Sequence, residues 1–113
     1  MSRKSDPLPL EPTRAWLSAG LDRPHMRPSR AAALARLAAP SPGELVLDPC
    51  GGIGMLAIEA AALQDVRAIS LDLDQPATDA AAANAAAAAR GGALRGTVEA
   101  RSADALHLIC SVR

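Results

Sequence analysis

Length, composition and charge already limit what this chain can be. Its 113 residues make at most one domain, and its formal net charge of zero argues against a nucleic-acid-binding surface spread over the whole chain. The two cysteines and two histidines form no Cys-x-x-Cys pair and no histidine cluster, and no apolar run is long enough to span a bilayer. We therefore expect an intracellular, cytoplasmic chain with no metal site, no disulfide framework and no membrane segment.

The first part of the chain is rich in proline. Five prolines among residues 1–28 predict an extended, partly disordered lead-in with at most a short turn over residues 13–19. Ser29 is the expected N-cap of a helix over residues 30–39, which the Pro40–Gly43 segment ends. We place the domain boundary here, with the lead-in at 1–28 and the folded part at 29–113.

Strands and helices alternate in the rest of the sequence. The expected elements are a strand over 45–47, a turn over 48–52, a helix over 53–63, a strand over 66–71, an alanine-rich helix ending at Arg90, and a strand within 96–100. Asp74 is the expected cap of the alanine-rich helix, and Gly91-Gly92 ends it. Strands separated by helices predict an α/β fold with a parallel sheet.

The turn after the first strand is the most informative part of the sequence. Asp48 is followed by Gly51, Gly52 and Gly54, and the next helix begins at once. Glycines let the backbone approach a ligand closely, and the first turn of a helix offers free N–H donors. An ordinary tight turn with Asp48 as its cap would explain less of this pattern, so the spacing favours a ligand-binding loop.

Further acids follow the second and third strands. Asp72 lies 20 positions after Gly52, where a carboxylate can bind both hydroxyls of a ribose. Asp74 has the competing role of a helix cap, so Asp72 is the better candidate. Asp104 follows the third strand and borders the expected adenine pocket, although a solvated loop acid explains it equally well. His25 and His107 are expected to be structural or exposed.

Two cofactors fit this spacing. Gly52-x-Gly54-x-x-Ala57 with Asp72 downstream satisfies the dinucleotide fingerprint, which leaves an NAD-dependent oxidoreductase open. Asp48 counts against NAD because a pyrophosphate would bring negative charge beside it, and a helix precedes the first strand. S-adenosylmethionine has an ammonium group and no phosphate, so it suits Asp48 better.

At these residues the chain resembles the class I S-adenosylmethionine-dependent methyltransferases, which have a Rossmann-like fold. More narrowly, it is similar to the THUMP-associated RNA methyltransferases that modify guanine N2, with their Asp-Pro-x-Cys-Gly-x-Gly and Ile-Glu-Ala motifs. The matching segments are residues 25–34, 47–54, 58–61, 72–74, 84–85 and 103–105. In this chain Cys50 stands one position early relative to the family pattern and is not carried over as a functional residue.

The resemblance assigns roles to six residues. Gly51, Gly52 and Gly54 would pass under the methionine part of S-adenosylmethionine. Asp48 would hold its amino acid end, Asp72 the ribose and Asp104 the adenine. A tRNA substrate is implied by the same resemblance.

One family segment has no counterpart here. The catalytic Asn-Pro-Pro-Tyr or Asp-Leu-Pro-Phe-Gly block should follow the fourth strand, and nothing in residues 106–113 resembles it. No catalytic residue is therefore assigned. We expect the chain to be the cofactor-binding half of a methyltransferase domain, which would not catalyse methyl transfer by itself. The alternative of a truncated product that has no enzymatic role, or that binds a partner, stays open.

Overall fold

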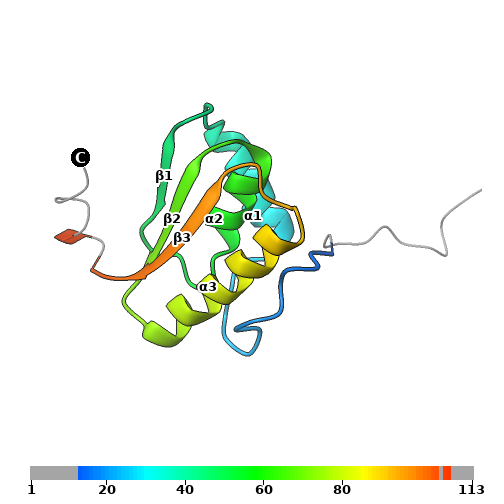
Figure 1. Cartoon of the computed structure of the whole chain (residues 1–113). Helices are drawn as coiled ribbons and strands as arrows, with labels where there is room; N and C mark the ends of the chain where they lie inside the picture. Colours follow the sequence, from blue (N-terminus) through cyan, green and yellow to red (C-terminus); the bar gives the residue numbers. More distant parts are fainter. Residues whose placement is uncertain (1–12, 105, 108–113) are drawn as a thin grey trace, which may run out of the picture.

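A three-stranded parallel sheet with helices between its strands forms the core of the molecule (Figure 1). The computed structural model describes residues 13–104 and 106–107. The elements follow in the order α1 (Pro28–Ala38), β1 (Leu45–Asp48), α2 (Met55–Leu63), β2 (Arg67–Asp72), α3 (Gln75–Arg90) and β3 (Thr97–Ser102). Both neighbouring strand pairs, β1–β2 and β2–β3, are parallel. The predicted α/β fold with a parallel sheet is confirmed.

One face of the sheet packs against the helices. Val46, Ala68 and Val98 stand in register across the three strands, and their side chains pack with Ala57 and Ala61 of α2. Figure 1 shows the three helices on the same side of the sheet. These contacts hold α2 against the strands. Because all three strands are parallel, their carboxyl ends lie at the same edge of the sheet.

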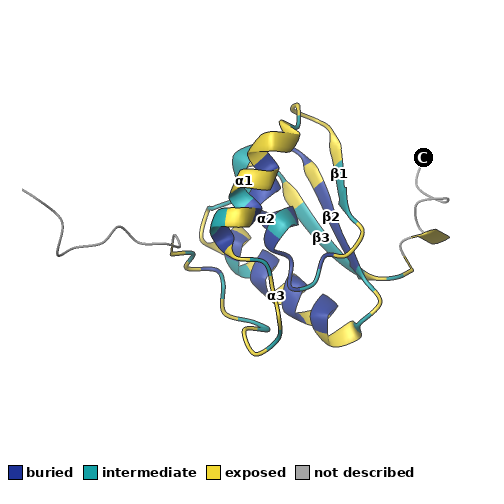
Figure 2. Cartoon of the chain, turned by 180° about the vertical axis from the view of Figure 1, so that it is seen from behind, coloured by how far each residue is buried: buried dark blue, intermediate teal, exposed yellow. Residues whose placement is uncertain are grey.

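Residues 13–27, which we call the strap, pack across the helices although they form neither helix nor strand (Figure 2). Trp16 is 6% exposed and belongs to the same buried cluster as Ile53 and Ala88. Arg14 forms a paired contact with the buried Glu59 of α2, with Nε 2.7 Å from Oε2 and Nη2 3.2 Å from Oε1. The expected domain boundary at residue 28 stays a prediction, but these contacts make the described lead-in part of the core.

The first helix begins earlier than the sequence suggests. Ser29 was expected as its cap, but α1 starts at Pro28, and Arg27 is the N-cap without a side-chain hydrogen bond. The Ser29 prediction is therefore wrong. Proline suits the first helical position because its fixed φ matches the helix and its missing N–H would have no partner there.

The residues in the turns determine where the second and third helices begin and end. Helix α2 begins at Met55 rather than 53, because Gly54 has a φ of 94°, outside the helical region. Asp74 caps α3 as predicted, accepting a hydrogen bond from the Ala77 N–H at 3.3 Å. Gly91 and Gly92 follow the end of α3, also as predicted, and Gly92 has a φ of 74°.

Membrane-spanning helices and metal-binding clusters are both absent from the part of the chain that the structure describes. None of its helices combines the length and the apolar character needed to cross a bilayer. Its His, Cys, Asp and Glu side chains nowhere gather in a group of three that could hold a metal ion.

Candidate functional site

The candidate ligand-binding residues come together at the carboxyl edge of the sheet. Asp48 is the last residue of β1 and Asp72 the last of β2, while Asp104 follows the end of β3. The glycines Gly51, Gly52 and Gly54 lie between β1 and α2. Open α/β sheets bind their ligands at this edge.

Two adjoining hollows divide these residues between them. The first hollow, of about 200 Å³, is lined by Pro24, His25, Met26, Asp48, Cys50, Gly51, Gly52, Ile53, Met55 and Leu56. The second hollow, of about 230 Å³, is lined by Pro49, Cys50, Asp72, Leu73, Ala103, Asp104 and Leu106. Cys50 lines both, so the two hollows are neighbours at the carboxyl edge of the sheet. Gly54 lines neither.

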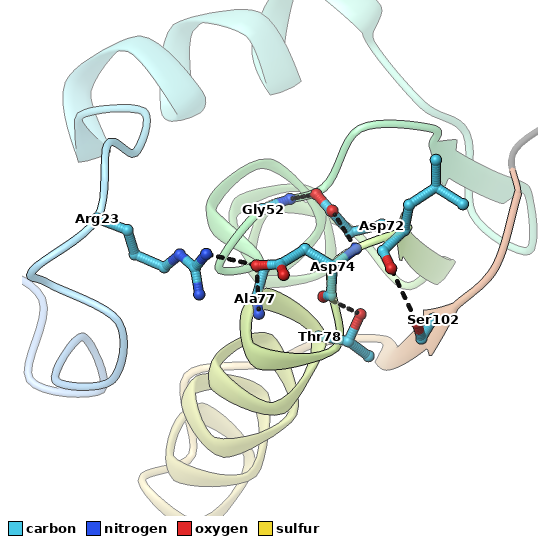
Figure 3. A network of polar contacts seen from close by, with 8 residues as sticks. Arg23, Gly52, Asp72, Asp74, Ala77, Thr78 and Ser102 are labelled. Carbon is cyan, nitrogen blue, oxygen red and sulfur yellow. Dashed lines mark hydrogen bonds and ion pairs between the residues drawn. The ribbon is translucent and has the colours of Figure 1, made fainter.

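Asp72 links the end of β2 to the glycine loop (Figure 3). Its Oδ2 accepts a hydrogen bond from the Gly52 N–H at 3.0 Å, and its Oδ1 accepts one from the Asp74 N–H at 2.9 Å. These two bonds fix the orientation of the carboxylate. Each oxygen of an ionised carboxylate can accept more than one hydrogen bond, so Asp72 can also accept from ligand hydroxyls.

Asp74 has structural contacts of its own. Besides capping α3, its carboxylate forms an ion pair with Arg23 of the strap, and its carbonyl accepts from the Thr78 hydroxyl at 3.2 Å (Figure 3). This supports choosing Asp72 over Asp74 as the ligand-binding acid at this strand end.

Asp48 is a half-buried acid with no cationic partner among the residues that the structure describes. Its Oδ1 accepts from the Cys50 N–H at 3.2 Å, so it also caps the turn. Burial raises the pKa of the Asp48 carboxyl above its usual value; the Cys50 N–H opposes this and the negative charge of Asp72 adds to it. Burial and a like charge both disfavour the ionised form of a carboxylate, so a cationic group that binds beside it stabilises that form.

Helix packing also explains why residue 54 is a glycine. A Cβ there would meet the Ala81 Cβ at 3.1 Å, so this glycine allows α3 to approach the start of α2. Its predicted contact with a cofactor stays a prediction, as do the contacts of the other five candidates.

The strap contributes part of the lining of the first hollow, which local sequence patterns do not indicate. Pro24, His25 and Met26 line the first hollow together with residues of the glycine loop. His25 is exposed, within the expectation for it, and its Nδ1 donates to the Arg23 carbonyl at 2.9 Å. His107 is exposed as well. The available signal was the resemblance of residues 25–34 to the Leu-Arg-Pro-Thr segment and first helix of the resembled family.

Comparison with known proteins identifies the domain. The chain is similar to the crystal structure of TrmN from Thermus thermophilus, with 33% identity and a TM-score of 0.60 over 81% of this chain and 27% of that one. The arrangement is thus a partial Rossmann-like methyltransferase fold. No match was found among curated proteins. Residues 20–111 match the family described as RMKL-like, methyltransferase domain, and the chain belongs to this family.

Proposed function

We propose that this chain is the S-adenosylmethionine-binding half of an RNA methyltransferase of the THUMP-associated type, acting on guanine N2 of tRNA. The observation that carries the proposal is the half-buried Asp48 beside the glycine loop in a chain of a methyltransferase family. The ammonium group of the cofactor would relieve the electrostatic cost of an ionised Asp48, whereas a pyrophosphate would increase that cost.

The two hollows suit the two ends of such a cofactor. In the first, Asp48 would hold the ammonium group beside Gly51 and Gly52. In the second, Asp72 would accept from the ribose hydroxyls and Asp104 from the adenine amine. The bound cofactor supplies an activated methyl group; the residues described here bind and orient it, and positioning of this kind is a large part of catalysis.

Calorimetric titration of the chain with S-adenosylhomocysteine tests the proposal. We expect saturable binding that Asp72→Ala weakens at least about 10-fold, since it removes charge-assisted hydrogen bonds. Asp79→Ala is the matched control, because it removes the same charge from an exposed site on α3. Binding of NADH without binding of S-adenosylhomocysteine would favour the oxidoreductase alternative instead.

Two exposed arginines support the RNA part of the proposal. Arg27 follows Met26, a residue of the first hollow, and Arg30 lies one helical turn further on in α1. Both are exposed and, within the described residues, neither has a carboxylate partner. Guanidinium groups beside a cofactor hollow are well placed to bind the phosphates of a polynucleotide substrate.

Replacing both arginines is expected to weaken tRNA binding by this chain. The Arg27→Ala/Arg30→Ala variant should lose affinity about 10-fold, and the negative slope of log K against log salt should become smaller in magnitude by about 1.4 to 1.8, as expected for two lost phosphate contacts. Filter binding at several salt concentrations measures both quantities. Arg36→Ala removes one such charge at the other end of α1 and is the control. Since Arg36→Ala removes one charge instead of two, half of the loss in log K and half of the change in slope with this variant would mean that binding depends on charge alone.

A further inference from the structure

Asn84 is the most completely hydrogen-bonded side chain among the described residues, and it is wholly buried in α3. Its Oδ1 accepts from the Ser18 N–H at 3.1 Å and the Ala19 N–H at 2.9 Å. Its Nδ2 donates to the carbonyl oxygens of Ala19 and Ile53, both at 3.1 Å. All the donors and acceptors of this amide are therefore used, and they reach two segments that are far apart in the sequence.

Both segments belong to parts of the chain that line the first hollow. Ile53 belongs to the glycine loop and lines that hollow directly. Ser18 and Ala19 do not line it, but they belong to the strap, which continues to the lining residues Pro24, His25 and Met26. Asn84 thus ties the glycine loop to the strap without lining the hollow itself.

The strap and the glycine loop are in close contact at Gly20. Gly20 follows the residues held by Asn84, and a Cβ there would lie 2.6 Å from Ile53 Cγ2 and 2.9 Å from Ala80 Cβ. Further along, Arg23 is paired with Asp74 at the start of α3. Contacts at Gly20 and Arg23 therefore fix the part of the strap that leads to the hollow.

We propose that Asn84 is a positioning residue that shapes the pocket for the amino acid end of S-adenosylmethionine and leaves the ribose and adenine end unaffected. This rests on the proposed function. The reason is geometric: Asn84 bonds Ile53 of the first hollow and the strap that leads to its other lining residues. The second hollow is formed by residues 49–50, 72–73, 103–104 and 106, and Asn84 has no hydrogen bond to any of them.

Comparing two ligands tests the role. S-adenosylhomocysteine has both ends, whereas adenosine has only the ribose and adenine end. In Asn84→Ala we expect the affinity for S-adenosylhomocysteine to fall about 10-fold and that for adenosine to change less than about 2-fold, because only the first hollow loses its support. Ala83→Gly weakens α3 at an exposed neighbour and controls for loss of helix stability.

A second measurement uses the unmodified chain and does not depend on the variant folding. Amide hydrogen exchange at Ser18 and Ala19 should slow when S-adenosylhomocysteine binds and stay unchanged with adenosine. A parallel loss of both affinities in Asn84→Ala, or equal protection by both ligands, would show that Asn84 only stabilises the fold. Failure of the unmodified chain to bind S-adenosylhomocysteine would instead contradict the proposed function, and this inference with it.

Discussion

Replacing Gly51 with alanine is expected to destabilise the chain by about 3 kcal/mol, at the upper end of what overpacking costs. A Cβ at this position would lie 1.8 Å from the Ser70 Oγ, 2.9 Å from the Ser70 Cβ and 3.2 Å from the Leu71 nitrogen. The loop cannot easily retreat, because the Gly51 N–H donates to the Leu71 carbonyl at 2.6 Å. Urea denaturation followed by circular dichroism measures the loss.

Gly52→Ala is the matched comparison for this variant. Gly52 has a φ of +53° but nothing within 4 Å of its missing Cβ, so only the left-handed backbone conformation opposes a side chain. That conformation costs about 1–2 kcal/mol for an ordinary residue. Adding Ser70→Ala to Gly51→Ala should recover part of the loss, since it removes the nearest atom. Equal losses at Gly51 and Gly52 would mean that the contact with β2 does not limit the loop.

Asp48→Asn is expected to weaken binding of S-adenosylhomocysteine about 100-fold, because it removes a charge-assisted contact to the ammonium group. The same substitution should stabilise the chain without ligand at neutral pH. Asparagine can still accept the hydrogen bond from the Cys50 N–H, and it carries no charge into the half-buried site. Affinity and stability should therefore change in opposite directions.

The pH dependence follows from the raised pKa of the Asp48 carboxyl. The folded chain holds this proton more tightly than the unfolded chain, so ionisation of Asp48 lowers stability as the pH rises from the usual aspartate pKa through the raised one. The advantage of Asp48→Asn should accordingly be full at neutral pH and shrink on acidification. Chemical denaturation across that range measures it, with Asp65→Asn as a control at an exposed acid. A constant difference at all pH values would contradict this account.

The order and type of the elements could be predicted because each depends on local chemistry. Asp74 followed by Pro76 begins a helix, a run of alanines sustains it, and Gly91 and Gly92 follow its end. Boundaries were less predictable where two residues competed for one role. Pro28 took the first position of α1, and Gly54 delayed the start of α2 through its left-handed backbone.

The edge of the sheet that carries the site could also be predicted, since acids and glycines follow the strands in sequence. What local patterns could not predict is the strap as a wall of the first hollow. Its attachment depends on pairs such as Arg14–Glu59 and Ser18–Asn84, which are 45 and 66 positions apart. These separations match neither helix nor strand periodicity, so local patterns do not predict the pairs. Only the folded structure shows that His25 and Met26 lie beside the glycine loop.

The burial of Trp16 has a practical consequence for spectroscopy. It is the only aromatic side chain among tryptophan, tyrosine and phenylalanine in the sequence, and it belongs to the strap. Tryptophan emission from this protein is therefore emission from the strap, in the buried cluster shared with Ile53 and Ala88. A shift of that emission to longer wavelength records detachment of the strap, whereas the far-ultraviolet dichroism records the helices. Where the emission shifts at a lower denaturant concentration than the dichroism, the strap has separated from a domain whose helices remain folded.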